Sequence, residues 1–147
     1  LLLVVGDTQK HKYNVMTIGW GSIGILWQKP VFSVLVRPTR YSYHFIEKNG
    51  EFTINVPDLS MKNEASFCGT KSGREFDKFK ELGLNLKDST KISIPYIDRC
   101  GLTYECRTIY KQKLDKKLIP HEVDKKLYPN KDYHTVYYGE ILAVHKK

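Results

Sequence analysis

Short runs of β-branched and aromatic residues, each ended by glycine or proline, recur along this chain and predict β-strands. These runs cover six segments: 13–18, 31–36, 52–56, 92–94, 102–110 and 135–144. The run Val-Phe-Ser-Val-Leu-Val at 31–36 is almost wholly apolar, which is typical of a strand buried on both faces. Pro38 is expected to end this strand, because proline has no amide proton to donate to a sheet.

Helix signals are fewer and shorter. Thr39 is predicted to cap a helix that stops at Asn49-Gly50, where glycine permits the left-handed conformation of a helix end. Two further short helices are expected. One covers 61–67 and is capped by Ser60, and the other covers 74–82, with apolar residues at helical spacing.

The number and order of these elements predict the fold class. Six or seven strands and two or three short helices, without regular alternation of strand and helix, argue for a closed antiparallel barrel of mainly β (α+β) character. The segment 111–132 is rich in lysine, aspartate and proline, and is expected to be an excursion with about one helical turn. No internal repeat or linker divides the 147 residues, so 1–147 are expected to form one domain.

Composition excludes several protein classes. With 41% hydrophobic and 27% charged residues, the chain is typical of a globular protein rather than a disordered one. No apolar run approaches the roughly 18 residues of a membrane span. Three cysteines cannot all pair within the chain, which favours a reducing compartment and a cytoplasmic location. The chain lacks an initiator Met, and its apolar run at 1–5 is too short for a signal peptide. A missing N-terminal segment is therefore expected.

The positive charge is the second compositional feature. The chain has 24 Lys and Arg against 16 Asp and Glu, a formal net charge of +8. Only five of these cations are arginines, and the lysines are scattered among acidic residues in the second half. Since no nucleic-acid-reading motif accompanies them, a solvated lysine-rich surface is favoured over a nucleic-acid face. The charge still favours small anionic ligands such as phosphates.

Several catalytic and metal motifs are excluded by their context. Gly19, Gly21 and Gly24 match the letters of a dinucleotide-binding motif, but the following segment 25–30 is short and ends in proline instead of opening a helix. A glycine-rich turn is predicted there. The three cysteines and five histidines lack the spacing of a metal site, so no metal is expected. A Cys–His nucleophile pair stays open, although buried structural thiols are the favoured interpretation.

Two segments are candidates for ligand binding. Residues 14–20 (Asn-Val-Met-Thr-Ile-Gly-Trp) offer hydrogen-bonding groups along one strand edge. Residues 37–42 (Arg-Pro-Thr-Arg-Tyr-Ser) place two guanidinium groups and two hydroxyl groups beside an expected helix start. Guanidinium groups and free helix amides both bind phosphate. The alternative is simple helix capping by Thr39 with both arginines solvated.

Six motifs follow one another along the chain. They are 14–21, 37–42, 52–57 (Phe-Thr-Ile-Asn-Val-Pro), 67–74 (Phe-Cys-Gly-Thr-Lys-Ser-Gly-Arg), 77–79 (Asp-Lys-Phe) and 133–141 (Tyr-His-Thr-Val-Tyr-Tyr-Gly-Glu-Ile). In this order they resemble the flavin reductase-like, split-barrel FMN-binding family, in particular its flavoredoxin-type branch. The resemblance covers nearly the whole chain and is weakest over 111–131.

The resemblance implies a Greek-key split β-barrel that binds FMN non-covalently and forms a homodimer, with the flavin near the subunit interface. It also implies roles for matching residues. The isoalloxazine ring would be lined by Asn14, Met16, Thr17, Gly19 and Trp20. The phosphate would be held by Arg37, Thr39, Arg40 and Ser42, and a closing loop would contribute Ser72, Gly73 and Lys78. His134 matches a position near the nicotinamide, and a structural histidine bonded to backbone is the alternative.

The activity implied by the resemblance is that of an FMN-dependent oxidoreductase. NADH or NADPH would give a hydride to FMN N5, and the electrons would pass to flavin, ferric iron or a protein partner. The chain offers no residue that the hydride step needs as a general acid or base. One alternative is an FMN-binding electron-transfer module reduced by a partner protein. A basic nucleic-acid-binding barrel is the other, and neither nucleic acid nor membrane is expected as a partner.

Overall fold

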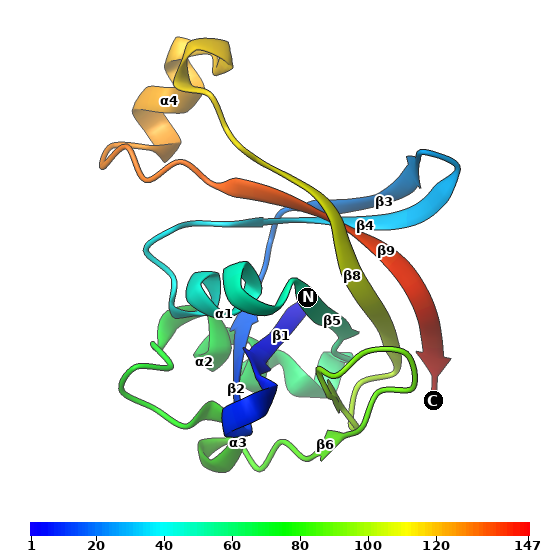
Figure 1. The fold of residues 1–147 in the computed structure, drawn as a ribbon. Coiled ribbons are helices and arrows are strands. Elements are labelled where there is room, and N and C mark those ends of the chain that lie inside the picture. Colours follow the sequence, from blue (N-terminus) through cyan, green and yellow to red (C-terminus); the bar gives the residue numbers. More distant parts are fainter.

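The computed structural model describes residues 1–147, which form one large antiparallel sheet covered by short helices (Figure 1). The seven strands of this sheet lie in the order β2-β1-β5-β8-β9-β4-β3, so β2 and β3 are its edges. Their bounds are β1 Leu2–Asp7, β2 Lys12–Thr17, β3 Gly21–Leu26, β4 Lys29–Val36, β5 Glu51–Val56, β8 Leu102–Lys113 and β9 Thr135–Lys146. Two further strands of two residues each, β6 (Leu86–Lys87) and β7 (Tyr96–Ile97), pair with each other outside this sheet.

The mainly β (α+β) class is confirmed, with four α-helices where two or three were expected. They are α1 Tyr41–Asn49, α2 Lys62–Thr70, α3 Lys78–Glu81 and α4 His121–Leu127. Single 3-10 turns cover Thr8–Lys10, Leu59–Met61 and Lys116–Leu118. None of the helices has the length and apolar content needed to cross a lipid bilayer.

The glycine cluster forms a strand where a turn was expected. Most of it belongs to β3, which pairs with β4 through a two-residue turn at Trp27-Gln28. Both turn residues have positive φ, 51° and 61°, as the common two-residue hairpin turn requires. The predicted close backbone approach does occur, because a Cβ atom on Gly21 would lie 2.5 Å from the Ser33 carbonyl oxygen. Glycine therefore permits pairing here instead of ending the strand.

The expected N-cap of α1 is wrong. Arg40 takes the N-cap position without a side-chain hydrogen bond, while the Thr39 hydroxyl donates to Asp132 at 3.3 Å. A carboxylate distant in sequence therefore binds the hydroxyl that was predicted to cap the helix. The C-terminal stop is confirmed, because Gly50 has φ of 73° and its amide donates to the Ile46 carbonyl.

Two other expected elements differ from prediction. The helix expected over 74–82 shrinks to α3, because Asp77 accepts a hydrogen bond from the Lys80 amide and caps the helix there. The strand expected over 92–94 does not form. Its Ser93 amide and hydroxyl both donate to the Glu51 carboxylate, so a side chain supplies the partner that a neighbouring strand would have supplied.

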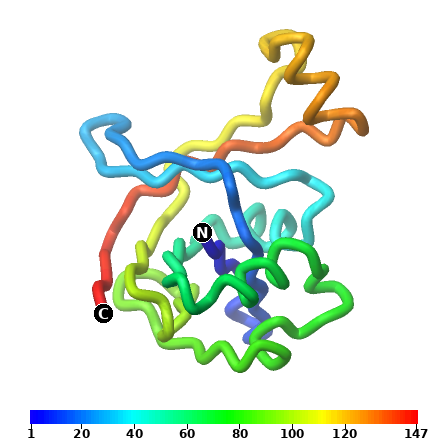
Figure 2. The backbone as a smooth tube through the Cα atoms, turned by 180° about the vertical axis from the view of Figure 1, so that it is seen from behind, coloured from blue at the N-terminus to red at the C-terminus, as the bar shows by residue number.

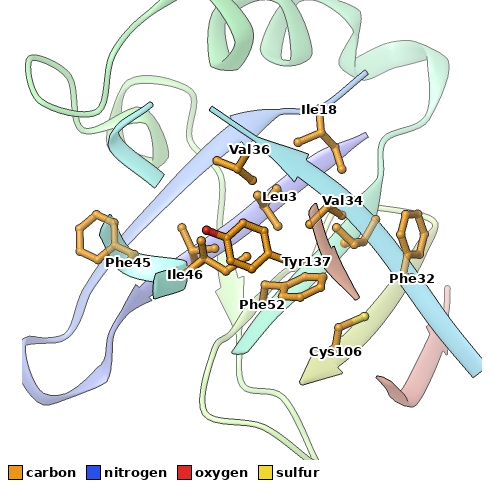
Figure 3. Close-up of a cluster of buried hydrophobic side chains, with 12 residues drawn as sticks. Leu3, Ile18, Phe32, Val34, Val36, Phe45, Ile46, Phe52, Cys106 and Tyr137 are labelled. Carbon is orange, nitrogen blue, oxygen red and sulfur yellow. The ribbon is translucent and has the colours of Figure 1, made fainter. Parts of the chain in front are cut away.

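The side chains of β1 alternate between two hydrophobic cores. Leu3 and Val5 belong to a twelve-residue cluster that includes Phe52 and Tyr137 (Figure 3). Leu2 and Val4 point to the opposite face and belong to a ten-residue cluster under α2. All four side chains are fully buried, so β1 is the strand that joins the two cores.

The longest strands carry two projections away from these cores. β8 and β9 are twelve residues each and pair with irregularities at 105/106 and 108/110, which increase strand bending and twist. Both backbone views show the β3–β4 hairpin and the segment around α4 extending beyond the helix-covered lobe (Figures 1 and 2). The excursion expected over 111–132 with about one helical turn thus contains a 3-10 turn and α4, and it begins only after β8 ends at Lys113.

Glu105 is a buried carboxylate that holds the loop before β7 against β8. It accepts hydrogen bonds from the amides of Thr90 and Lys91, both at 2.7 Å, and contacts His145. Burial opposes its ionisation, yet these hydrogen bonds keep the pKa of Glu105 below its ordinary value. A depressed pKa stabilises the folded state above the carboxyl group's unfolded pKa, and this contribution is lost as pH falls through the folded pKa.

Replacing Glu105 by Gln should destabilise the protein by about 2–3 kcal/mol at pH 7, because an amide cannot accept all these hydrogen bonds. Urea unfolding measures the difference. The matched control is Glu122→Gln, at an exposed position of α4, which should change stability by less than about 0.5 kcal/mol. Equal stabilities of the two variants would contradict the assigned role of Glu105.

Candidate functional site

Two adjoining pockets lie where β2 meets the start of α1 and the loop between α2 and α3. The first has a volume of about 270 Å³ and the second about 170 Å³. Met16, Thr17 and Arg40 line both, so the two form one continuous candidate site. The position follows from β2, which supplies Asn14, Met16 and Thr17 to the lining while Val15 enters the core.

Every residue predicted for the site lines one pocket or the other. Besides the three shared residues, the first pocket contains Asn14, Thr39, Ser42, Ser72, Gly73 and Lys78. The second contains Gly19, Trp20, Arg37 and His134. Residues from four separate segments of the sequence therefore meet at one place. Their contact with a ligand stays a prediction.

The first pocket is strongly cationic. Arg40, Lys71, Arg74 and Lys78 line it, and no aspartate or glutamate does. Uncompensated cations converging on a cavity favour an anion, and a phosphate fits this charge.

Lys78 is buried, with 4% of its surface exposed. Its ammonium donates to the carbonyl oxygens of Val15 and Cys68, each at 2.9 Å, and burial lowers its pKa. An ammonium has three N–H donors, so one remains for a ligand in the first pocket. Because two carbonyls hold the nitrogen in place, Lys78 would meet an anion with little loss of side-chain freedom.

Asn14, Ser42 and Gly73 form one wall of the first pocket. The Asn14 amide donates to the Ser42 hydroxyl at 2.7 Å. Gly73 packs so closely that an added Cβ atom would lie 2.0 Å from Asn14 Oδ1 and 2.9 Å from Tyr41 Cδ1. Only glycine fits there without moving the wall, so the loop after α2 closes against β2 and α1 at this residue.

The second pocket is less polar and has an aromatic side. Trp20 is 41% exposed, and its ring lies 4.8 Å from the His134 ring. Leu35 and Ile18 add apolar surface. An exposed tryptophan beside a cavity offers a flat face on which a planar ligand can stack.

Arg37 lines only the second pocket, whereas Thr39 and Ser42 line the first and Arg40 lines both. Its guanidinium donates to Asp132 at 2.6 Å and to the Leu127 carbonyl at 2.8 Å. These bonds occupy much of its donor capacity, whereas Arg40 lines both pockets and has no carboxylate partner. Of the two arginines, Arg40 is the one free to reach an anion in the first pocket.

His134 is neutral at physiological pH. Burial, with the positive charge of Arg37 as a further cause, lowers the pKa of His134 to about 4. The ring is 8% exposed, and its Nδ1 atom lies 2.8 Å from the Tyr128 hydroxyl oxygen. The alternative of a structural histidine whose ring bonds to backbone differs in its partner, because the ring bonds to a tyrosine side chain. A neutral imidazole can donate or accept one hydrogen bond without carrying charge.

Sequence reasoning missed some pocket residues, notably Tyr41, Lys71 and Arg74. The Arg74 guanidinium lies over the Tyr41 ring, 5.2 Å from its centre, and donates to the Thr39 carbonyl. All three belong to motifs named in the sequence analysis, 37–42 and 67–74. The motifs therefore indicated the site, although these three residues were not predicted as ligands. Cys68 also lines the pocket, but burial raises its pKa to about 11, which leaves an unreactive thiol.

Comparison with known proteins places this architecture among flavoproteins. The sequence matches the family described as "Flavin reductase like domain" over residues 1–147. An uncharacterized protein of Archaeoglobus fulgidus is 28% identical over 142 residues, which are 97% of this chain and 69% of that protein. An uncharacterized protein of Pyrococcus abyssi is 30% identical over 88% of this chain, and the match spans 64% of that protein. The chain thus spans about two thirds of these relatives.

The flavoredoxin of Desulfovibrio vulgaris has a similar solved structure, with a TM-score of 0.78 and 27% identity over 99% of this chain and 68% of that one. The FMN-binding protein of Thermus thermophilus has the same fold, with a TM-score of 0.77 and 19% identity over the same shares of the two chains.

The buried neutral His134 should make stability depend on pH. Its unfolded pKa is about 6.5 and its folded pKa about 4. The contribution to stability is therefore complete above about pH 6.5 and is lost as pH falls toward 4. When the pH is lowered from 7.5 to 5, the unfolding free energy of the native protein should fall. This fall should exceed that of the His134→Gln variant by about 1–2 kcal/mol. Urea unfolding at both pH values measures this, and His121→Gln, at an exposed residue, should behave like the native protein.

Proposed function

Because the chain belongs to the flavin reductase-like domain family, an FMN-binding family, we propose that it is an FMN-dependent oxidoreductase that uses NADH or NADPH as reductant. The observation that carries this proposal is the meeting of all thirteen predicted site residues on two joined pockets, one cationic and one aromatic. FMN has the same two parts, a phosphate and a flat ring.

The residues present fit FMN. The first pocket supplies cations, hydroxyls and no carboxylate, which suits a phosphate of about two negative charges. Arg40, Lys78 and Ser42 would hold the phosphate. In the second pocket Trp20 and the adjoining β2 backbone would line the ring, and no carboxylate there opposes a negative charge on a reduced ring.

When bound, FMN supplies the N5 atom that accepts a hydride from the dihydronicotinamide and from which electrons pass to an acceptor. The chain's own residues bind and orient. His134 is neutral and Cys68 is a protonated thiol at physiological pH, so neither is a general acid or a nucleophile here. The proposal places the reaction in the cytoplasm, in keeping with three buried, unpaired cysteines.

An electron-transfer module reduced by a partner protein is the second candidate. The similarity in fold to a flavoredoxin supports it. The lysine-rich segment around α4 also extends away from the cores, where a partner could reach it (Figure 1). The two candidates share FMN and differ only in the reductant.

The proposal includes a homodimer assembled through the exposed face of β3. Ile23, Ile25 and Trp27 are 56%, 74% and 63% exposed. Ile23 pairs across the strands with the buried Phe32, so both side chains lie on the same face of the sheet. The apolar surface of that face therefore extends from the core onto the exposed edge strand. Adjacent exposed apolar side chains on a free sheet edge favour association. A second copy would cover them next to Trp20, one residue before β3, and so enclose the second pocket.

Purified protein loaded with FMN should be yellow, with an absorbance maximum at about 450 nm that bleaches when NADH or NADPH is added without oxygen. Protein that binds no FMN would contradict the proposed function. Bound FMN that neither nucleotide bleaches would select the electron-transfer module.

A pair of glycine variants sharpens this test. Gly73→Ala should weaken FMN binding at least about tenfold, because its Cβ atom would displace Asn14 or Tyr41 from the wall of the first pocket. Gly101→Ala is the matched control, since an added Cβ atom meets nothing within 4 Å there, and it should bind FMN like the native protein.

The dimer is tested by sedimentation. The native protein should sediment as a dimer, and Ile25→Lys should shift it toward monomer by placing an uncompensated charge in the interface. Leu59→Lys, at a leucine that is 98% exposed on the helical side, should leave the dimer intact. A native protein that is monomeric at micromolar concentration would overturn this part of the proposal.

A further inference from the structure

The segment between β8 and β9, residues 114–134, returns to the second pocket after α4. Two residues of the loop between β4 and α1 hold this segment in place as it returns. Arg37 donates to the Leu127 carbonyl at 2.8 Å and to Asp132 at 2.6 Å, and the Thr39 hydroxyl donates to Asp132. The part of the chain with the weakest family resemblance is therefore anchored beside the candidate site.

This anchoring buries Tyr128, which follows α4 directly. Only 4% of its surface is exposed, and its amide donates to the Asp124 carbonyl at 2.9 Å. The Arg37 guanidinium lies over its ring, 4.9 Å from the ring centre, and the Tyr133 ring packs against it at 5.0 Å. The ring is fixed from two sides, and its hydroxyl oxygen lies 2.8 Å from His134 Nδ1.

The direction of this hydrogen bond determines the tautomer of His134. Burial raises the pKa of Tyr128, so the phenol keeps its proton, and the imidazole is neutral. His134 Nδ1 is the only hydrogen-bond partner of the Tyr128 hydroxyl. If Nδ1–H donated instead, the buried phenol proton would have no acceptor, at a cost of about 1–3 kcal/mol. The phenol therefore donates to Nδ1, and the single imidazole proton lies on Nε2.

The Nε2 atom faces the second pocket. It makes no hydrogen bond within the protein, and it is not among the buried polar atoms that lack a partner, of which Thr108 Oγ1 is the sole example. It is therefore accessible, and the open space beside the ring is the second pocket, which the His134 ring lines together with the Trp20 ring that it contacts.

We propose that Tyr128 is a positioning residue that holds His134 in its Nε2–H tautomer, so that the second pocket presents a hydrogen-bond donor and selects flat ligands with a carbonyl oxygen. The Nε2–H donor and the exposed Trp20 ring beside it would define such a ligand by one acceptor atom and by its plane. The tautomer follows from this chain alone, whereas the ligand class rests on the proposed function. The oxygen can come from the carboxamide of a nicotinamide or from the carbonyl of an electron acceptor.

Nitrogen-15 NMR of the histidine side chains tests the tautomer without flavin. At pH 7.5, His134 of the native protein should show a protonated Nε2 and an unprotonated Nδ1 that accepts a hydrogen bond. Tyr128→Phe keeps the ring under Arg37 and removes the hydroxyl, so the Nδ1 signal should lose its hydrogen-bond shift and the Nδ1–H form should become detectable. Tyr133→Phe is the matched control. It removes a hydroxyl that donates to Asp124 and should leave both His134 signals unchanged.

Binding of small probes to the FMN-loaded protein tests the ligand class. Nicotinamide and benzaldehyde represent the two sources of the carbonyl, and benzene and toluene are counterparts without any hydrogen-bond acceptor. Tyr128→Phe should weaken the binding of a carbonyl probe by about three- to tenfold and leave the binding of its counterpart unchanged. The carbonyl probe whose binding weakens identifies the source of the carbonyl oxygen.

Two results would overturn the proposal. One is a native His134 protonated on Nδ1. The other is a Tyr128→Phe variant with native His134 signals and native affinity for both carbonyl probes. A protein that failed to bind FMN would remove the proposed function but would leave the tautomer to be decided by NMR, so the two failures are distinguishable.

Discussion

The burial of β1 on both faces is the constraint on which the rest of the structure depends. Its residues Leu2 to Val5 are fully buried, and successive side chains enter opposite cores. Such a strand must have a neighbour on each edge and a layer on each face, and β2, β5, α1 and α2 supply them. Since β2 pairs with β1 over its full length, the same constraint sets the position of the strand that lines both pockets.

The candidate site lies where these layers meet, and its charge and shape come from residues of several elements there. The loop after α2 closes on Asn14 through Gly73, and Lys78 spans from α3 to carbonyls of β2 and α2. Cations from three segments therefore face one cavity with no carboxylate among them. Beyond the end of β2 the surroundings become aromatic, with Trp20 and, just before β9, His134. The separation of a charged end from a flat apolar end is what makes an FMN-shaped ligand a consistent proposal.

Local sequence patterns predicted most strands, because β-branched runs ended by glycine or proline act within a few residues. Residues 31–36 and 52–56 lie in strands as expected. The errors arose where a distant group changed the outcome. Thr39 bonds to Asp132 instead of capping α1, and Glu51 takes the amide of Ser93 that a strand would have used. No local pattern contains a partner that lies 42 or 93 positions away.

The sequence alone determined the mainly β class, because strand periodicity is a property of neighbouring residues. Its ordered motifs also carried the family resemblance, which implied the thirteen site residues and a phosphate-bearing ligand. Only the tertiary structure decided that Arg37 is bound by Asp132 while Arg40 remains available. It also decided that the lysine-rich excursion brings Tyr128 to His134. Charge pairing, burial and proton position depend on which atoms meet across the fold, and that is set by the packing of the two cores around β1.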